Sequence, residues 1–431
     1  MPGAPAGLQY AQPSATYEAE VPIAPNTPSS TGGAIDTYAV LPALPAGIAL
    51  DATTGVISGT ALAMTPSASY AVTGTNAVGF ATAHVTLGVT LNQGDDLSPK
   101  APASFTDDDI RYFMGRTQFG GSAAMFTSIQ AVGIPAFVDQ MVTFSANPAL
   151  DAEADALLVN ATDPAGLEGK FPNFNQLAQY WLHYMTKTSN PFQEVLAFYW
   201  HDHFAASDVV LDGGQNWWVK SHINLFRLQG NGNLRPFLVN MARDWVMLAW
   251  LNGVESTVGA PNENFGREFW ELFTLGVDNG YTQADIVQSA KALTGYRLTF
   301  DATTNLTSIA FSPARHDPGA KTVLGHVIPG QNTTDDYQAV VDITLDNRPV
   351  AEFISKSLFE YFCYTGPKTI PTDAMAATLR GANYELKPLL QALFKSKAFY
   401  SAKSRKGLVK SQVDHVLGFI RATGLLTSVS R

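Results

Sequence analysis

The stretch NENFGREFWELFTLG (residues 262–276) combines a polar and an aromatic set of residues, and the rest of the chain can be organised around it. Wound as an α-helix at about 100° per residue, it places these two sets on opposite faces. The polar face carries Glu263, Asn264, Arg267, Glu268, Glu271 and Thr274, and the apolar face carries Phe265, Phe269, Trp270, Leu272 and Phe273.

The polar face leaves two interpretations open. An ordinary amphipathic helix turns such charges toward water. Exposed faces, however, commonly alternate lysines with glutamates for i,i+4 pairing, whereas here three glutamates share a single arginine and no lysine. That composition favours a face turned toward a cleft, a cation or a buried arginine.

The overall composition indicates a packed globular protein of two or three domains. The chain has 431 residues, of which 46% are hydrophobic and 15% charged. Its net charge of -10 argues against a nucleic-acid partner, because phosphates would be repelled. The single cysteine, Cys363, excludes internal disulfides and cysteine-rich zinc sites.

No run of residues has the length and apolar character of a membrane span. The nearest, residues 236–251, is interrupted by Arg243 and Asp244. The first residues, MPGAP, lack the basic start and apolar core of a secretory signal. If the protein is exported, its signal peptide is absent from this chain.

The first hundred residues predict a small antiparallel β-sandwich. Val85, Leu87 and Val89 alternate with polar or small residues, which is the period of a half-buried strand. Turn signals separate the other short β-prone runs. The expected strands lie at residues 17–21, 37–41, 55–58, 70–73 and 81–89.

This region resembles an immunoglobulin-like repeat found in bacterial surface and secreted proteins. The resemblance rests on LPAGIALDATTGVISGT (residues 44–60) and on residues 70–89, and it extends over most of residues 8–91. It implies an exported or cell-surface context and a spacer or adhesive role. We therefore expect an Ig-like domain at residues 1–91, followed by a linker at residues 92–104 that is rich in turn-forming residues.

From residue 105 onward the chain predicts a mostly α-helical domain that extends to residue 431. TDDD (106–109) and TQAD (282–285) each have the pattern of a helix start, with Thr at the N-cap and an acid three residues later. Strand signals occur only near residues 297–311. Helical periodicity recurs at residues 109–116, 122–130, 134–142, 174–187, 191–204, 215–227, 236–251, 262–275, 283–294, 334–345, 348–364, 373–381, 386–395 and 405–423.

Residues 236–251 are predicted to form one buried helix, which raises the question of what neutralises its two charges. Arg243 and Asp244 are adjacent, so they cannot face each other and each needs another partner. We expect the acidic face of residues 262–276 to pair with Arg243, and a histidine or arginine to pair with Asp244. A structural network and the lining of a site both fit these residues.

Two segments carry histidines beside aspartates. In WHDHF (200–204), His201 and His203 would share one side of an extended chain and could chelate a metal, but on a helix they would diverge. They could equally serve as capping groups at a helix end. The second segment, RHDPGAK (315–321), is predicted to be a loop in which His316 and Asp317 orient a base or a ligand.

These segments and the opening stretch together resemble the bacterial family called domain of unknown function 1800, over about residues 105–431. Six blocks agree in order, at residues 198–204, 243–253, 261–276, 281–285, 292–296 and 316–325. The resemblance implies an exported protein whose genes often neighbour those of a sulfatase-like family. It implies no reaction, because the family's activity is not established.

The chain departs from the family pattern in two places. Gly266 stands where alanine is more common, which should weaken the helix slightly. Family members also continue beyond the amphipathic segment at residues 407–424 into a further segment with Pro-Pro and Gly-Trp signatures. We therefore interpret the chain as truncated at its C-terminus.

Two functional hypotheses follow. In the first, the protein is a secreted, metal-assisted hydrolase with a divalent metal ion as cofactor. The metal would be held by some of His201, His203, His316, Glu268 and Glu271. Glu263 or Asp317 would act as the general base, Arg267 or Arg243 would stabilise negative charge, and Asp244 would line the site.

In the second hypothesis the protein is a non-catalytic surface or assembly protein. Its polar cluster would then be a structural ion-pair network, and its partner a surface glycan or the sulfatase-like protein encoded nearby. Convergence of the two histidine segments and the glutamate helix on one cavity would favour the first hypothesis.

Overall fold

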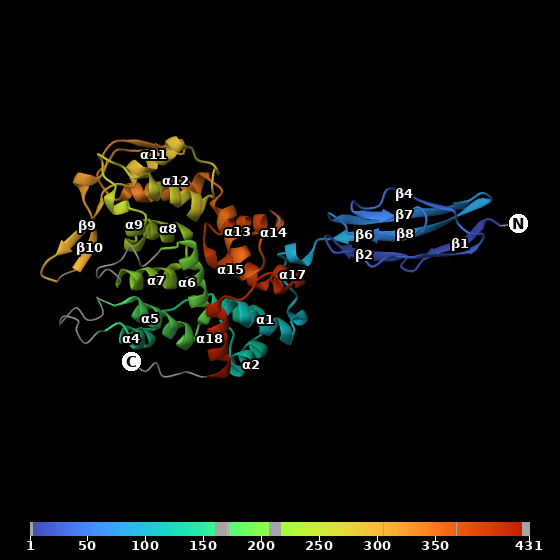
Figure 1. Cartoon of the computed structure of the whole chain (residues 1–431), viewed down its shortest axis with the longest axis horizontal. Coiled ribbons are helices and arrows are strands. Elements are labelled where there is room, and N and C mark those ends of the chain that lie inside the picture. Colours follow the sequence, from blue (N-terminus) through green and yellow to red (C-terminus); the bar gives the residue numbers. More distant parts are fainter. Residues whose placement is uncertain are drawn as a thin grey trace. The chain divides into compact units, whose positions relative to one another are not determined.

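The computed structural model describes residues 3–159, 170, 172–206, 217–304, 306–367 and 369–424, except for the side chains of residues 369 and 370. The chain divides into two compact units, Met1–Asp96 and Leu97–Arg431 (Figure 1). The first contains β-strands arranged in sheets and the second is mostly helical, so the fold class expected from the sequence is confirmed. None of the described helices is both long enough and apolar enough to cross a membrane.

The first unit has a four-stranded sheet in the order β2-β8-β7-β4, with smaller pairs β1-β3 and β5-β6. Most neighbours are antiparallel, but β2 runs parallel to β8, which the expectation of a purely antiparallel sandwich missed. The strands are β1 Pro5–Tyr10, β2 Ser14–Glu18, β3 Pro28–Gly32, β4 Thr37–Leu41, β5 Ile48–Leu50, β6 Ile57–Gly59, β7 Thr65–Asn76 and β8 Gly79–Thr90.

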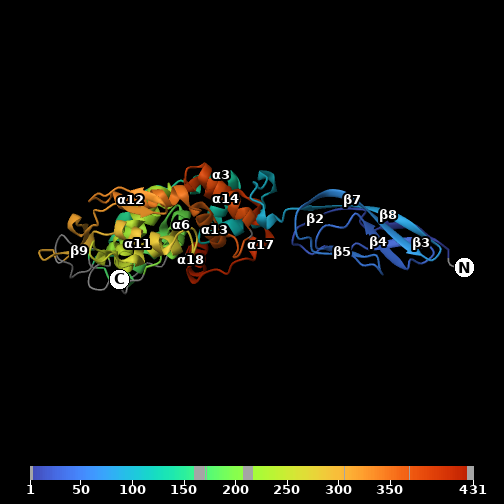
Figure 2. The ribbon, with the colours of Figure 1, turned by 90° about the horizontal axis from the view of Figure 1, so that it is seen from above.

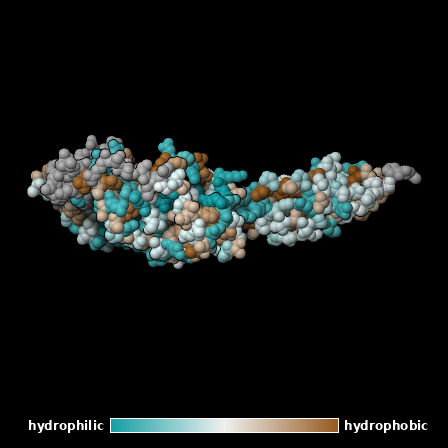
Figure 3. Space-filling model, turned by 90° about the horizontal axis from the view of Figure 1, so that it is seen from below, coloured by the Kyte–Doolittle hydropathy of each residue, from teal (hydrophilic) through white to brown (hydrophobic). Residues whose placement is uncertain are grey.

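The alternation predicted for residues 81–89 is observed in β8. Val85, Leu87 and Val89 are buried in the core of the unit, while His84 is exposed. The same face of β7 contributes Val72, so the two long strands build one apolar layer. In Figure 3, the surface of this unit shows small, separate apolar patches among polar residues.

The predicted linker is divided between the two units. The Asn92 side chain donates to the Ala19 carbonyl oxygen at 2.9 Å, which holds the start of the segment on the sandwich. The Lys100 N–H donates to the Lys395 carbonyl oxygen, and the Lys397 N–H donates to that of Ser98. Residues 98–100 therefore form part of the helical unit.

Helix α6 passes through the middle of the helical unit in both ribbon views (Figures 1 and 2). The described helices are α1 Asp107–Thr117, α2 Ala123–Val132, α3 Ile134–Met141, α4 Pro148–Asp155, α5 Phe174–Lys187, α6 Pro191–His203, α7 Trp217–Gln229, α8 Leu234–Ala242, α9 Trp245–Trp250, α10 Glu263–Glu268, α11 Gln283–Ala292, α12 Asp335–Asn347, α13 Val350–Phe362, α14 Thr369–Gly381, α15 Leu386–Lys395, α16 Lys397–Tyr400, α17 Ala402–Arg405 and α18 Gln412–Thr423. The predicted start of one helix at residue 215 lies outside the described residues.

Short elements complete this unit. Two antiparallel hairpins pair β9 Tyr296–Asp301 with β10 Leu306–Phe311 and β11 Lys321–Val323 with β12 His326–Ile328. The sequence predicted the first hairpin region and missed the second. Both predicted capping boxes are present, at Thr106 with Asp109 and at Thr282 with Asp285.

The single helix predicted at residues 236–251 is wrong, because the chain forms two helices that meet at Arg243-Asp244. Asp244 has extended backbone angles, and its carboxylate accepts hydrogen bonds from the N–H groups of Val246 and Met247. This is an N-cap for α9, in which a short polar side chain satisfies free N–H groups. The charged pair therefore interrupts the helix.

The stretch 262–276 is helical but not uniformly α-helical. After α10 it widens into a π-helix, η5, at Phe269–Thr274, where the Leu275 N–H bonds to the Trp270 carbonyl oxygen five residues earlier. The wider turn shifts the two predicted faces. Leu272, expected on the apolar face, is 53% exposed, and Thr274, expected on the polar face, is buried.

Gly266 lies where α10 packs against α11. A Cβ atom at this position would lie 2.4 Å from the Ser289 hydroxyl oxygen, which is too close without a shift. We expect Gly266→Ala to gain about 0.5–1 kcal/mol of helix propensity and to lose about 1–3 kcal/mol by overpacking. We therefore expect Gly266→Ala to lower the stability of the protein. This differs from the sequence-based expectation, in which Gly266 weakens the helix relative to alanine.

A double-mutant cycle with Ser289→Ala measures this contact. In the Ser289→Ala background, Gly266→Ala is expected to stabilise the protein, because the hydroxyl is gone. Urea unfolding followed by tryptophan fluorescence reports the helical unit, since all seven tryptophans lie between residues 181 and 270. Equal effects of Gly266→Ala in both backgrounds would contradict the proposed clash.

Candidate functional site

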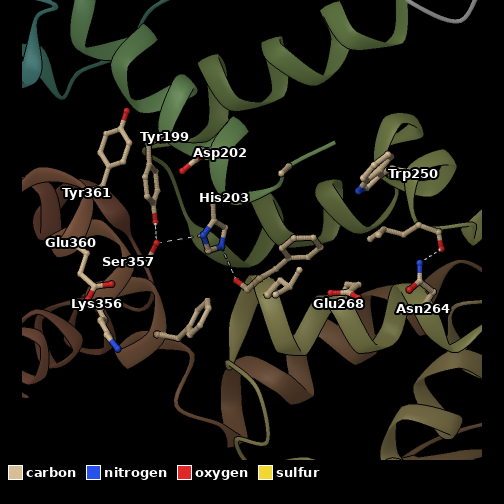
Figure 4. Close-up of a pocket in the computed structure, with 15 residues that line it drawn as sticks. Tyr199, Asp202, His203, Trp250, Asn264, Glu268, Lys356, Ser357, Glu360 and Tyr361 are labelled. Carbon is tan, nitrogen blue, oxygen red and sulfur yellow. Dashed lines mark hydrogen bonds between the residues drawn. The ribbon is translucent and has the colours of Figure 1, made fainter. Parts of the chain in front are cut away.

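A cleft of about 910 Å³ opens where the end of α6 faces α9, α10, η5 and α13 (Figure 4). Its wall combines aromatic rings with carboxylates, one amine, one amide and three hydroxyls. The residues that line it are Tyr199, Asp202, His203, Ala205, Trp250, Leu251, Asn264, Glu268, Leu272, Phe273, Phe353, Lys356, Ser357, Glu360 and Tyr361.

His203, the last residue of α6, is held by contacts on both ring nitrogens. Its Nε2 lies 2.9 Å from the Phe273 carbonyl oxygen, which can only accept, so Nε2 carries the proton. Its Nδ1 lies 3.5 Å from the Ser357 hydroxyl, and that hydroxyl is 2.8 Å from the Tyr199 hydroxyl. Burial lowers the pKa of His203 to about 4, so the ring is neutral at pH 7.

Glu268 is the carboxyl group of α10 that faces the cleft. Burial and the neighbouring negative charge of Glu271 raise its pKa, and Arg267 opposes part of this rise. Arg267 is engaged along the side of the helix, at 3.1 Å from Glu263 and 3.4 Å from Glu271. The four charged residues of the opening stretch therefore separate into a lateral Glu-Arg-Glu ladder and one carboxyl group in the cleft.

The cleft receives two further carboxylates from other elements. Asp202 lies at the exposed end of α6, and Glu360 lies on α13, one turn after Lys356. Figure 4 shows these groups and Glu268 arranged around the central His203. With three carboxylates against one lysine, the cleft is acidic.

His201 faces a different pocket, on the other side of α6. Its ring packs edge-on against Trp181, with 5.1 Å between ring centroids, and lies 6.3 Å from the ring of His222. Because α6 remains helical through residue 203, His201 and His203 diverge, which is the second of the two arrangements that the sequence left open.

Asp244 has the kind of partner that the sequence predicted. His222 Nδ1 lies 2.8 Å from its carboxylate. The expected pairing of Arg243 with the acidic face of residues 262–276 is wrong, because Arg243 instead donates to the Thr334 carbonyl oxygen at 2.6 Å. The break between α8 and α9 turns these two adjacent side chains toward different neighbours.

His316 and Asp317 belong to a separate buried cluster. His316 bonds through Nδ1 to the Thr294 carbonyl oxygen and through Nε2 to the Asp336 carboxylate, which Lys321 also contacts at 2.6 Å. The Asp317 carboxylate accepts from the Gly319 N–H and so shapes the loop. Neither residue lines the large cleft.

This placement does not support one metal centre shared by His201, His203 and His316. The three histidines face three different surroundings, and both ring nitrogens of His203 and of His316 have partners. Among the residues that the structure describes, no three His, Cys, Asp or Glu side chains are arranged to hold a metal ion.

A family model described as "Protein of unknown function (DUF1800)" matches residues 112–431, about three quarters of the chain. The chain belongs to the DUF1800 family. Ahead of the DUF1800 region, residues 3–92 match a family model described as "Putative Ig domain". No curated protein matches this DUF1800 member.

Solved structures have low similarity to this DUF1800 protein. Two proteins of Bacteroides fragilis, titled "putative alpha-galactosidase" and "putative alpha-galactosidase/melibiase", share 17% identity over 27% of this chain and 25% of theirs, at TM-scores of 0.18. A chimeric titin Z1Z2 shares 19% identity over 21% of this chain and 96% of its own, at 0.17. The chain thus spans about a quarter of the first two structures, and similarities at these TM-scores indicate neither a shared overall fold nor a shared activity.

Sequence reasoning missed the contribution of α13 to the cleft of this DUF1800 domain. Glu352, Lys356 and Glu360 follow one another at i,i+4 spacing on this helix, and Ser357 lies beside Lys356. That pattern marks a narrow polar face and could have indicated a site. His222, which pairs with Asp244, carried no signal because its partner is distant in sequence.

Proposed function

We propose that this member of the DUF1800 family is an exported hydrolase that cleaves glycosidic bonds, with the large cleft as its active site. The observation that carries the proposal is the convergence of three carboxyl groups, from α6, α10 and α13, on one aromatic-walled cleft. Clefts of several hundred Å³ with few convergent polar groups are the usual form of small-molecule sites.

Glycosidic hydrolysis requires two carboxyl groups in different protonation states. One donates a proton to the departing oxygen, and the other activates water or attacks the sugar carbon. Glu268 fits the proton donor, because burial and Glu271 favour its neutral form. Asp202 and Glu360 place two further carboxyl groups at the same cleft, and either could be the second group of the pair. Water is consumed as the C–O bond breaks, with its hydrogen on one product and its hydroxyl on the other.

The aromatic residues suit a sugar substrate. Trp250 and Tyr361 line the cleft and are only partly buried, so their faces can contact the apolar face of a sugar ring. Asn264 lies one turn before Glu268 on α10, and its amide can bond to sugar hydroxyls. A polyhydroxylated ligand would find both kinds of group in this cleft.

His203 is a positioning residue in this proposal. Its ring connects η5 with α13 through the Phe273 carbonyl and the Ser357 hydroxyl. The neutral ring adds no positive charge beside Glu268 and therefore does not oppose its raised pKa. The proposed reaction uses carboxyl groups and water, and no step in it requires the divalent metal ion of the sequence-based hypothesis.

The alternative function is recognition of a glycan without cleavage, as in a surface or assembly protein. The same aromatic and amide groups would bind the sugar, and the raised pKa of Glu268 would have no role. The two functions are separated by incubating the full chain with a panel of polysaccharides and measuring both binding and the release of reducing ends. Binding without release would favour recognition and contradict hydrolysis.

Export is part of the proposal and rests on the resemblance of residues 8–91 to repeats of surface and secreted proteins. Fractionation of the source cells tests it. Recovery of the protein from the cytoplasmic fraction alone would contradict it. The sulfatase-like partner suggested by the family resemblance can be tested in the same material by co-purification.

Glu271→Gln is expected to shift the pH dependence of hydrolysis. The general acid must be protonated, so activity falls as pH rises through the raised pKa of Glu268. Removing the negative charge of Glu271 lowers that pKa, and the alkaline limb of the kcat/KM profile moves to lower pH. The matched control is Glu263→Gln, which removes the other Arg267 partner but does not line the cleft. An unchanged limb in Glu271→Gln would refute this role.

A further inference from the structure

A second pocket, separate from the large cleft, lies between α5, α6 and α7, which are neighbouring helices in Figure 1. Its volume is about 320 Å³. Most of its wall is apolar, and Leu177, Ile223 and Val246 are almost fully buried there. Two polar side chains interrupt this wall, His201 and His222.

His222 is held with one nitrogen fixed and the other without a partner. Its Nδ1 lies 2.8 Å from the Asp244 carboxylate oxygen, which accepts, so Nδ1 carries the proton. With the proton on Nδ1, Nε2 offers its lone pair as an acceptor. Nε2 has no hydrogen-bond partner among the described residues. Because His222 is only 1% exposed, bulk water does not reach this nitrogen either.

A buried acceptor without a partner costs about 1–3 kcal/mol in an ordinary core. Asp244 holds the ring in this state with an oxygen that also caps α9, so the arrangement is part of the local architecture. The Nδ1 atom of His201, from the facing helix, is likewise buried without a partner. The pocket thus presents unsatisfied nitrogens within an apolar wall, which is the usual make-up of a small-molecule site.

We propose that this pocket binds a compact, mainly apolar molecule that carries one hydroxyl group, with the hydroxyl donating to Nε2 of His222. The apolar body of the ligand packs against Leu177, Ile223 and Val246. The hydroxyl satisfies the acceptor that Asp244 holds in place. Phenol is the simplest probe of this chemistry, and fluorobenzene has nearly the same size and shape without the donor.

The test compares the affinities of the two probes for the full chain and for His222→Phe. Fluorine and proton NMR of the ligands measure both dissociation constants, and the fluorescence of Trp181, which lines the pocket, reports occupancy. The wild type should bind both probes. In His222→Phe the ratio of the phenol Kd to the fluorobenzene Kd should rise about tenfold, the factor contributed by one net hydrogen bond.

Two controls make the result specific. Ala178→Phe introduces a ring at the wall of the pocket and should abolish the binding of both probes. His203→Phe, on the opposite side of α6, should leave the Kd ratio unchanged, because His203 lines the other cleft.

Three results would overturn the proposal. The first is an equal Kd ratio in wild type and His222→Phe, and the second is the absence of binding by both probes to the wild type. The third is stoichiometric Zn²⁺ binding that His222→Phe abolishes and that displaces phenol, because it would assign the two histidines to a metal ion. If His222→Phe does not fold, greater thermal stabilisation of the wild type by phenol than by fluorobenzene at the same concentration supports the proposal, and equal stabilisation contradicts it.

Discussion

Glu268→Gln is expected to reduce glycan hydrolysis by about two to four orders of magnitude, the usual contribution of a positioned general acid. Glutamine retains the shape of the side chain but cannot deliver a proton to the departing oxygen. Because the cleft is otherwise unchanged, the affinity for the glycan should remain close to that of the wild type. Initial rates of reducing-end release and calorimetric titration of the same glycan measure the two quantities.

Glu263→Gln is the matched control for this experiment. It makes the same chemical change on the same helix, at a glutamate that bonds to Arg267 and Gln283 beside the cleft. Its rate should stay near that of the wild type. Equal losses in both variants would point to a disturbed helix, and full activity in Glu268→Gln would exclude Glu268 as the acid.

Lys321→Met is expected to destabilise the helical unit by about 3–5 kcal/mol, which is typical of breaking a buried ion pair by removing one partner. The side chains of Lys321 and Asp336 are both fully buried, and their charged atoms lie 2.6 Å apart. His316 contacts the same carboxylate oxygen, and Gln331 donates to the other. Urea unfolding monitored by tryptophan fluorescence measures the loss.

Lowering the pH should reduce the loss of stability caused by Lys321→Met. Burial raises the pKa of Asp336, but the hydrogen bonds from His316 and Lys321 outweigh burial and hold that pKa below its usual range. The stability contributed by the ionised carboxylate is present above its unfolded pKa of about 4 and is lost as pH falls through the lower folded value. The difference between wild type and Lys321→Met should therefore narrow at acidic pH.

The control for Lys321→Met is Arg380→Met. Arg380 pairs with Glu352 on the surface, where both side chains are more than 40% exposed. Such pairs contribute about 0–1 kcal/mol, because water screens them. If the two variants lose similar stability, the buried Lys321–Asp336 pair contributes no more than a surface pair, and the prediction is contradicted.

The candidate site could be predicted in part from local patterns. The polar face of residues 262–276 favoured a cleft, a cation or a buried arginine. Glu268 does line a cleft, but the same pattern could not separate Glu268 from Glu271, which pairs with Arg267. The π-helix after residue 268 altered which side chains share a face. Packing against neighbouring helices decides whether such a π-helix forms. A fixed period of 100° per residue therefore cannot predict it.

The histidines show where local reasoning ends. The order W-H-D-H-F left open whether His201 and His203 share a side, and the continuation of α6 decided that they do not. Their surroundings, the Phe273 carbonyl oxygen for His203 and the ring of His222 for His201, come from segments outside α6. A ring nitrogen becomes a ligand, a donor or an acceptor only when such a partner is in place.

The sequence alone was sufficient to predict the division into a β-rich and a helical part, the starts of the helices at Thr106 and Thr282 with their capping boxes, and membership of the DUF1800 family. These follow from side-chain periodicity, from hydrogen bonds within four residues, and from ordered blocks of residues, all of which are local. Tertiary structure alone decided that Glu268, His203 and α13 surround one cleft, whereas His201 and His316 face other surroundings. These groupings depend on contacts between residues far apart in the chain, and such contacts exist only after the helices have packed.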